Sequence, residues 1–312
     1  MMKLAVIGSN MIDVISYTDI IPVAGETREV KDFAINCGGK GANQAIAAAK
    51  LGADVLMLTT IGDDVFGKMV LENFNAYQVD TKYVRTAKGS SNGIATILVD
   101  ESSQNRILIN KGANTYLTAV DVEAAATDLQ QCALCILQLE IELNTVYAAI
   151  EFANKHQIPV LLNPAPAIAD LDLDMACKCD FFVPNETELN IITGLPVESE
   201  AEIKKAALTL VDRGLKNVIV TMGSRGSLWV NKEHCEHVPA YAVQAVDTTG
   251  AGDAFIGCFA AVYVKTKDIL QAIQQATLFA ALSVTKTGTQ GSYPTKQEFT
   301  LALDRFHFGS IF

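Results

Sequence analysis

The segment 246–255 contains the residues of clearest chemical meaning in this chain. It places Gly250, Ala251 and Gly252 directly before Asp253, where a strand-like stretch gives way to a helical one. Small residues let the backbone N–H groups of a helix N-terminus approach an anion closely, and the helix dipole favours negative charge there. A carboxylate beside such a site can act as a base that accepts a proton from a hydroxyl. The pattern therefore indicates phosphoryl transfer to an alcohol.

A simpler interpretation of the same segment is a glycine-rich turn that caps a helix. Asp253 would then lie in the first turn only because negative charge is favoured there. The rest of the chain has to separate the two interpretations.

Composition excludes several classes of protein. The chain has 312 residues, of which 50% are hydrophobic and 19% charged, so it can bury a large core, and no disordered tail stands out in its composition. The net charge is −11 and Lys and Arg form no cluster in the sequence. Since binding to a phosphate backbone needs a basic surface, a nucleic-acid partner is not expected.

Neither secretion nor membrane insertion is expected. The first apolar run is too short for a signal peptide, and no stretch approaches the roughly 18 apolar residues of a membrane span. The cysteines are odd in number and scattered, which favours reduced thiols and a cytoplasmic location; they are Cys37, Cys132, Cys135, Cys177, Cys179, Cys235 and Cys258.

Strand-like and helix-like segments alternate along most of the chain. Strands are expected at 4–8, 54–60, 133–139, 158–162, 181–183, 217–221 and 227–230. Helices are expected at 42–51, 118–131, 144–156, 202–213, 251–265 and 268–285. This order predicts a three-layer α/β/α fold with a mainly parallel sheet, which binds ligands at the carboxyl ends of its strands.

Two stretches interrupt this rhythm. Residues 14–36 and 91–111 alternate as strands do, without a helix between the strands. We expect them to form a small antiparallel sheet that acts as a lid or a subunit contact. The α/β core then comprises 1–13, 37–90 and 112–312.

Three further segments are candidates for the site. Gly38–Gln44 is a glycine-rich turn that enters a helix and brings Lys40 and Asn43 near the end of the first strand, but it lacks the spacing of a Walker A loop. Asn185–Glu188 follows a strand and either caps a helix or supplies a carboxylate to Mg²⁺. Thr221–Gly226 ends another strand with glycines that would let a nucleotide approach the backbone.

Together, these segments resemble the signatures of the ribokinase-like (PfkB-type) carbohydrate kinase family. The resemblance extends from residue 8 to residue 292 and includes Gly38–Gln44 and Asp247–Asp253 in the family's order. It implies the ribokinase-like fold and transfer of the γ-phosphoryl group of ATP to a primary hydroxyl of a sugar. It also implies a homodimer formed through the lid.

The resemblance assigns roles by position. Asp253 would be the catalytic base, surrounded by the amides of Gly250, Ala251 and Gly252. The sugar would contact Asp13, Gly39, Lys40, Asn43, Glu140 and Asp253. ATP would contact Asn185, Thr221, Gly223, Ser224, Gly226, Gly252 and Thr277, and Glu188 would serve Mg²⁺. A monovalent cation (K⁺) would bind, mostly through backbone carbonyls, at Asp247, Thr249, Ser283, Lys286, Gly288 and Ser292.

One departure from the family pattern concerns the sugar. Met11 occupies the position, two residues before Asp13, where ribokinases carry Asn, and Asn10 is displaced by one. A thioether is a poor hydrogen-bond partner for a sugar hydroxyl, and a CH₂ packs well against it. This variation resembles the deoxyribokinase branch and predicts phosphorylation of 2-deoxy-D-ribose at O5, with ribose as a poorer substrate. The alternatives are that Met11 is ordinary core beside a ribose site, or that the substrate is another sugar or a nucleoside.

Two rival functions lack supporting residues. A nicotinamide-dependent dehydrogenase would show a dinucleotide glycine fingerprint after the first strand, and Gly8–Met11 does not supply it. A non-catalytic sugar sensor would not need Asp253 together with Glu188 and the small residues at 250–252.

Overall fold

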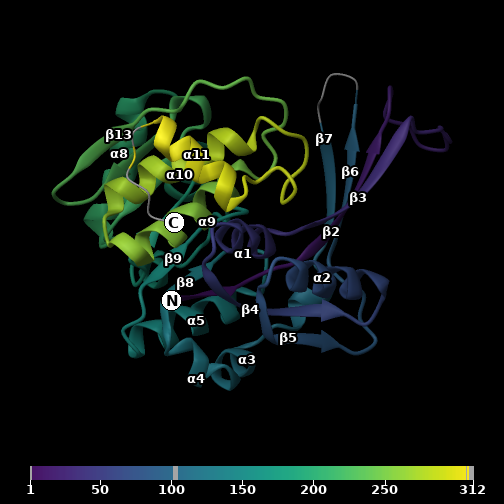
Figure 1. Cartoon of the computed structure of the whole chain (residues 1–312), viewed down its shortest axis with the longest axis horizontal. Coiled ribbons are helices and arrows are strands. Elements are labelled where there is room, and N and C mark those ends of the chain that lie inside the picture. The colour runs from purple at the N-terminus through teal and green to yellow at the C-terminus, as the bar shows by residue number, and fades with distance from the viewer. Residues whose placement is uncertain (1, 101–104, 307, 309–312) are drawn as a thin grey trace.

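The computed structural model describes residues 2–100, 105–306 and 308 of the chain. The expected lid segment 91–111 includes residues 101–104, and the expected core includes residues 1, 307 and 309–312; these lie outside the described residues. Within the described part, the protein contains a large sheet with helices on both faces and a smaller sheet at one side (Figure 1).

The large sheet has nine strands among the described residues, in the order β13-β12-β11-β10-β9-β8-β1-β4-β5. All neighbours from β5 to β11 are parallel, and β12 and β13 add an antiparallel edge. The strands are β1 Lys3–Ile7, β4 Asp54–Gly62, β5 Asp80–Ala87, β8 Cys132–Leu137, β9 Val160–Leu162, β10 Phe181–Phe182, β11 Val218–Thr221, β12 Ser227–Val230 and β13 Cys235–Val238.

Side chains alternate between the two faces of this sheet. Leu4 and Val6 of β1 pack into one core, and Ala5 and Ile7 into the other. The first core lies under α1 Lys40–Lys50, α2 Val65–Ala76, α9 Ala251–Thr266, α10 Ile269–Ser283 and α11 Lys296–Arg305. The second lies under α3 Ala119–Ala124, α4 Ala126–Leu129, α5 Leu143–Lys155, α6 Leu173–Ala176, α7 Glu186–Thr193 and α8 Glu200–Arg213. The predicted three-layer α/β/α class is confirmed.

The single helix predicted at 118–131 is wrong. It is two helices, because Ala125 between α3 and α4 has φ −89° and ψ 1°, outside helical geometry. The sequence pattern also predicts no element at α2, β5, α6, β13 or α11.

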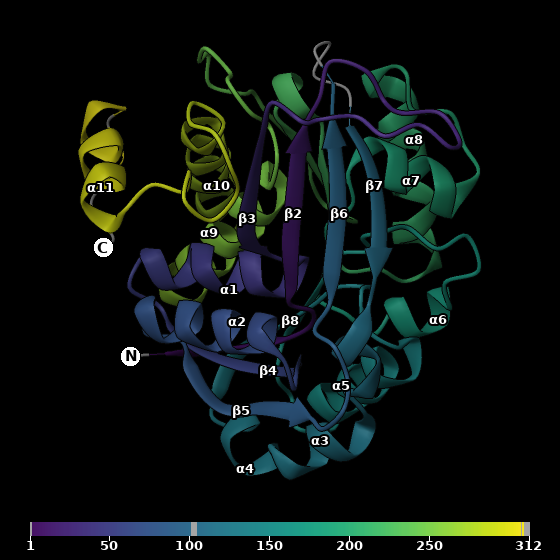
Figure 2. The same ribbon diagram turned by 90° about the vertical axis from the view of Figure 1, so that its right-hand side faces the viewer.

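The smaller sheet consists of β2 Met11–Tyr17, β3 Asp32–Gly38, β6 Ile94–Val99 and β7 Asn105–Asn110, in the order β3-β2-β6-β7. Its two hairpins are antiparallel, as expected, but they join through a parallel β2–β6 pair, which was not expected. The reason is that β2 and β6 both leave the core in the same direction; in Figure 2 they run upright beside each other, while β4 and β5 run across. We call this sheet the lid.

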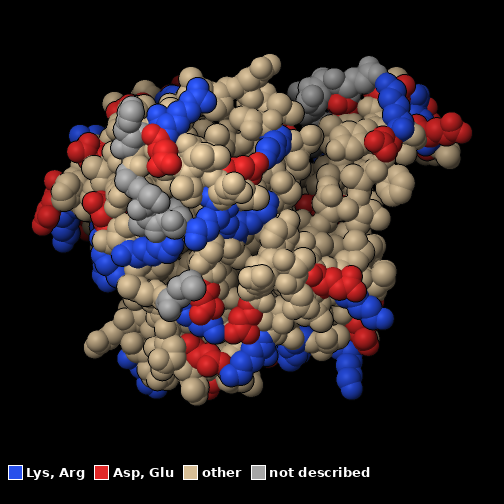
Figure 3. Space-filling view, in the orientation of Figure 1, with Lys and Arg blue, Asp and Glu red and all other residues tan. Residues whose placement is uncertain are grey.

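The surface is mixed in charge. In Figure 3 a hollow separates the lid from the helical part of the molecule, and basic side chains gather in a band on the helical side. The even spread of Lys and Arg along the sequence did not indicate this band. Among the described residues, no helix combines the length and the apolar character that a membrane crossing requires.

Candidate active site

The start of α9 is shaped by glycine. Gly250 precedes the helix with φ 76°, a left-handed conformation, and a Cβ there would lie 2.3 Å from Thr289 Cγ2. The hydroxyl of Tyr293 donates to the Gly250 carbonyl at 3.2 Å. The helix therefore begins at Ala251 in a fixed place. The Ala251 N–H donates to the Thr248 carbonyl at 3.2 Å, so of the three predicted amides only those of Gly250 and Gly252 are available to an anion.

Asp253, in this first turn, is only 7% exposed. Two amide side chains from α1 donate to its carboxylate: Asn43 Nδ2 lies 2.9 Å from Oδ2, and Gln44 Nε2 lies 2.9 Å from Oδ1. Gln44 was not among the predicted site residues, although it belongs to the glycine-rich segment Gly38–Gln44. Its adjacency to Asn43 was the one available signal, because α1 and α9 are more than 200 residues apart in sequence.

The turn before α1 is packed against the connection between β1 and β2. Gly39 has φ 89°, and a Cβ on it would lie 2.7 Å from the backbone N of Met11. Glu140, which follows β8, accepts hydrogen bonds from the backbone N of Lys40 at 2.9 Å and from Ser9 Oγ at 2.5 Å. The structure thus brings the predicted residues Gly39, Lys40 and Glu140 together.

A cavity of about 160 Å³ lies in front of Asp253. Its walls combine residues from α1, from the starts of α7 and α9 and from the end of β11, and include Lys40, Asn185, Glu188, Thr221, Gly250, Ala251, Gly252 and Asp253. Several predicted residues do not line it, among them Met11, Asp13, Gly39, Asn43, Glu140, Gly223, Ser224, Gly226 and Thr277.

The charges around this cavity are coupled. Burial lowers the pKa of Lys40, but the negative charges of Asp253, Glu140 and Glu188 outweigh burial and raise it overall. Burial raises the pKa of Glu188, against the opposing effects of the Asn185 backbone and of Lys40. Lys40 therefore stays a positively charged ammonium among carboxylates and can bind a further anion.

Asn185 and Glu188 form a capping box at the start of α7, in which each side chain accepts the other's backbone N–H at 2.8 Å. The capping interpretation is thus present in the structure. Because Glu188 also lines the cavity, this role does not exclude a second one.

Asp13 lies on β2, on the same face as Met11 two residues earlier. A Cβ on Gly38 would lie 2.2 Å from Asp13 Oδ2, so the carboxylate rests directly on that glycine. Asn10 faces elsewhere: its Nδ2 donates to Thr59 Oγ1 at 2.8 Å and to the Thr60 carbonyl at 3.0 Å. Met11 is 2% exposed and lies on the same face of β2 as Asp13, as the alternation of the strand predicts.

Asp13→Asn is expected to stabilise the protein without ligands at pH 8. Burial, followed by the charges of Glu140 and Asp253, raises the pKa of Asp13 from 3.8 to about 6. The folded state therefore binds this proton more tightly than the unfolded state, and stability falls as pH rises between these two values. Removing the carboxylate should add on the order of 1–3 kcal/mol above pH 6.

This gain should shrink at pH 5, where Asp13 is largely protonated in the folded protein. Urea unfolding at pH 5 and pH 8 measures the gain in the free energy of unfolding. Asp170→Asn, at an exposed site, is the control. An equal loss of stability for Asp13→Asn at both pH values would contradict the prediction.

The predicted ATP contacts lie around the ends of β11 and β12. Gly223 and Ser224 belong to the short helix η2 (Gly223–Arg225), and Gly226 has φ 94°, with a Cβ position only 2.0 Å from the Val238 carbonyl oxygen. Thr277 of α10 lies beside Ser227 of β12, with 3.5 Å between their hydroxyl oxygens. These residues flank the cavity on the side of Thr221.

The residues predicted for a monovalent cation lie in two neighbouring loops. Asp247 accepts hydrogen bonds from the backbone N of Thr249 at 2.9 Å and of Gly288 at 2.8 Å. Burial raises the pKa of Asp247, but these hydrogen bonds outweigh it and lower the pKa overall. Lys286 Nζ binds Glu298 at 2.8 Å, and the Ser283 and Ser292 hydroxyls donate to nearby carbonyls. Among the described residues, no group of three or more His, Cys, Asp or Glu could hold a metal ion.

Comparison with known proteins agrees with this geometry. The model of the pfkB family carbohydrate kinases matches residues 1–296. A deoxyribokinase from Salmonella typhi is 56% identical over 298 residues, covering 96% of this chain and 97% of that protein. A ribokinase from Mus musculus is 38% identical, covering 96% and 94%. The structure of Arabidopsis thaliana ribokinase complexed with ribose and ATP superimposes with a TM-score of 0.90 at 30% identity, covering 96% and 97%. The chain therefore belongs to the pfkB family of carbohydrate kinases.

Proposed function

We propose that this carbohydrate kinase transfers the γ-phosphoryl group of ATP to the O5 hydroxyl of 2-deoxy-D-ribose, with D-ribose as a secondary substrate. The observation that carries the proposal is the buried carboxylate of Asp253, which lies at the N-terminus of α9 and shares a cavity with Lys40. The 56% identity to a protein named deoxyribokinase supports the choice of sugar.

In this proposal, Asp253 accepts the proton of O5 as the new O–P bond forms and ADP leaves. Phosphoryl transfer has a loose transition state, so catalysis depends mainly on position and on charge stabilisation. The N–H groups of Gly250 and Gly252 receive the equatorial oxygens of the phosphoryl group in transit, whereas the N–H of Ala251, which was also expected to do so, is bound to the Thr248 carbonyl. The Lys40 ammonium adds positive charge to the wall of the same cavity, and Asn185, Thr221 and the 223–226 turn hold the nucleotide.

The proposed Mg²⁺ site is Glu188. A half-buried carboxylate on the cavity wall fits Mg²⁺, which takes oxygen ligands, keeps several waters and in kinases is held largely by the nucleotide's phosphates. When bound, the ion would neutralise charge on those phosphates.

The proposed K⁺ site lies between the loops 246–249 and 284–292. Its fit rests on Asp247, whose carboxylate links the two loops and remains ionised, and on the backbone carbonyls of loop residues such as Lys286 and Gly288. The loop that would hold the ion continues directly into Gly250. Binding there would fix the start of α9.

The preference for deoxyribose is proposed to come from Met11. Asn10 does not replace the missing amide, since its side chain is bound to β4. A hydroxyl buried against Met11 without a partner would cost on the order of 1–3 kcal/mol. Apolar pockets reject an extra hydroxyl by only about 10²-fold, so some activity with ribose should remain.

The test is kcat/KM for deoxyribose, ribose and a nucleoside with ATP, Mg²⁺ and K⁺. We expect kcat/KM to be higher for deoxyribose than for ribose. Met11→Asn should lower the deoxyribose-to-ribose ratio of kcat/KM by about tenfold or more. Ile12→Val, on the other face of β2, is the control. Equal or better kcat/KM for ribose in the unchanged protein would refute the preference.

We further propose that residues 14–36 and 91–111 act as a lid and form a homodimer in a cytoplasmic protein. The outer strands of the lid expose apolar side chains, including Phe33 at 63%, Leu108 at 75% and Ile109 at 54%. Such a surface favours a protein partner. All seven cysteines are free thiols in the described chain, as a reducing compartment requires.

A further inference from the structure

Two chains of amide side chains converge on Asp253. In one, Asn73 Nδ2 donates to Gln290 Oε1 at 2.7 Å, Gln290 Nε2 donates to Asn43 Oδ1 at 2.9 Å, and Asn43 donates to Asp253. In the other, Gln138 Nε2 donates to Gln44 Oε1 at 2.6 Å, and Gln44 donates to Asp253. In both chains the successive hydrogen bonds are donated toward the carboxylate; Gln44 Nε2 also donates to Asn163 Oδ1 at 3.2 Å.

The direction of these bonds matters because an amide has two unlike ends. If Asn43 turned its side chain over, its oxygen would face the carboxylate of Asp253 and repel it. Gln290 prevents this, since its N–H group needs the Asn43 oxygen as an acceptor. Asn73 in turn occupies the Gln290 oxygen. Gln290 and Asn43 are 5% and 6% exposed, so water competes little for these bonds.

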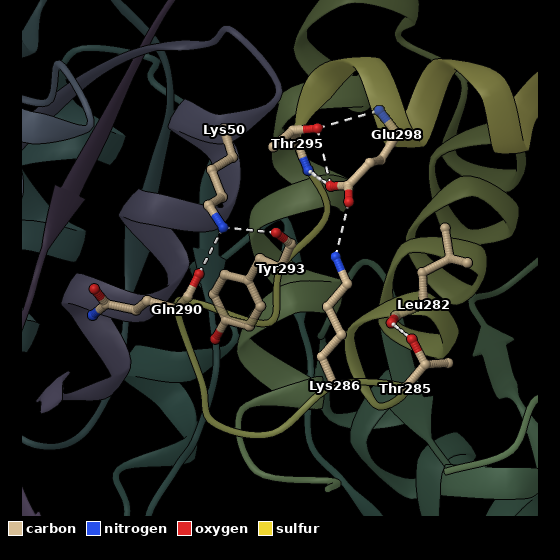
Figure 4. Close-up of polar contacts among 8 residues, drawn as sticks. All are labelled: Lys50, Leu282, Thr285, Lys286, Gln290, Tyr293, Thr295 and Glu298. Carbon is tan, nitrogen blue, oxygen red and sulfur yellow. Dashed lines mark hydrogen bonds and ion pairs between the residues drawn. The ribbon is translucent and has the colours of Figure 1, made fainter. Parts of the chain in front are cut away.

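Gln290 itself is fixed by the far end of α1. Lys50 Nζ donates to the backbone carbonyls of Gln290 at 2.8 Å and Tyr293 at 2.7 Å. Figure 4 shows the ammonium pointing at both carbonyls, above the ring of Tyr293. Helix α1 therefore holds this loop twice, through Lys50 at its last turn and through Asn43 at its first.

We propose that Gln290 is a positioning residue for catalysis: it orients Asn43 so that an N–H group, and not an oxygen, faces the Asp253 carboxylate. This inference rests on the proposed role of Asp253 as the base. Gln290 lies on the loop between α10 and α11, 37 positions beyond Asp253 and 247 beyond Asn43, and acts on the base only through Asn43.

Gln290→Glu tests the proposal most sharply, because it keeps the shape and replaces the donor with an acceptor. Asn43 would then turn its N–H group toward Glu and its oxygen toward Asp253, so the base would take up a proton more readily. We expect the acidic limb of the kcat/KM profile to move up by about one pH unit. The rate should therefore fall most at the acidic end of the profile and recover as the pH rises.

The other charged or titratable groups that face Asp253 are Lys40, Asp13, Glu140, Glu188 and Tyr293. The substitution leaves all of them in place. Gln297→Glu, which adds the same charge at an exposed position of α11, is the control and should leave the profile unchanged.

Gln290→Met is measured alongside in case the glutamate variant does not fold. It removes the donor without adding charge, and we expect a smaller shift in the same direction. A merely structural role would lower the rate equally at all pH values. A profile that superimposes on that of the unchanged protein, or a uniform loss in a folded variant, would overturn the proposal.

A parallel measurement on Asp253→Asn distinguishes a wrong assignment of the base from a wrong role for Gln290. If that variant keeps its turnover, the assignment of the base is wrong. If it loses turnover while the Gln290 variants keep the normal profile, only the role of Gln290 is wrong.

Discussion

Asp253→Asn is expected to lower kcat by about 10²–10⁴ while the affinity for sugar changes little. The substitution preserves the size of the side chain and removes its capacity to accept the hydroxyl proton. The cavity and the α9 amides remain, so binding should persist. Steady-state kinetics gives kcat, and calorimetric titration with the sugar gives the affinity.

The same substitution at Asp212, which is exposed on α8, serves as the control and should leave kcat unchanged. Thermal unfolding shows whether each variant is folded. Near-normal turnover of a folded Asp253→Asn protein would exclude the carboxylate as the base. It would leave the membership in the kinase family untouched.

The second large effect is expected for Gly252→Ala, with a loss of about 10²-fold in kcat/KM for ATP. Among the described residues, no heavy atom lies within 4 Å of a Cβ built on Gly252, and the residue lines the cavity. A methyl group there would stand where the phosphoryl group has to pass, and misplacement by about 1 Å can cost this much. Alanine is the better helix former, so the melting temperature should not fall.

Gly250→Ala provides the contrast. Its φ of 76° and its contact with Thr289 make a methyl group strained in the folded protein, so this variant should lose stability as well as activity. Gln297→Ala, which introduces alanine at an exposed position of α11, provides the neutral control. If Gly252→Ala kept full activity with a normal melting temperature, the phosphoryl group would not pass beside the N–H groups at the start of α9.

The family and the fold class were predictable because they depend on local signals. Small residues before Asp253, the glycine-rich turn before α1 and the alternation of strands and helices are all visible within short windows. The resemblance to the PfkB-type family drawn from them is confirmed by the family match and by the relatives.

What sequence could not provide were contacts between distant segments. Gln44 and Gln290 reach Asp253 directly or through Asn43 only after α1, α9 and the loop before α11 have packed together. The parallel pairing of β2 with β6 likewise depends on where the two strands leave the core, which alternation cannot reveal. The break at Ala125 has no glycine or proline to mark it.

The pairing of Met11 with Gly38 has a consequence for how this enzyme can diversify. These two residues are the innermost pair of the β2–β3 hairpin and also adjoin Asp13 and Gly39. The start of α9 is instead fastened through α1 and the loop that carries Gln290 and Tyr293. Under the role proposed for Met11, substitutions at the base of one hairpin can therefore change sugar choice while the residues proposed for phosphoryl transfer stay the same.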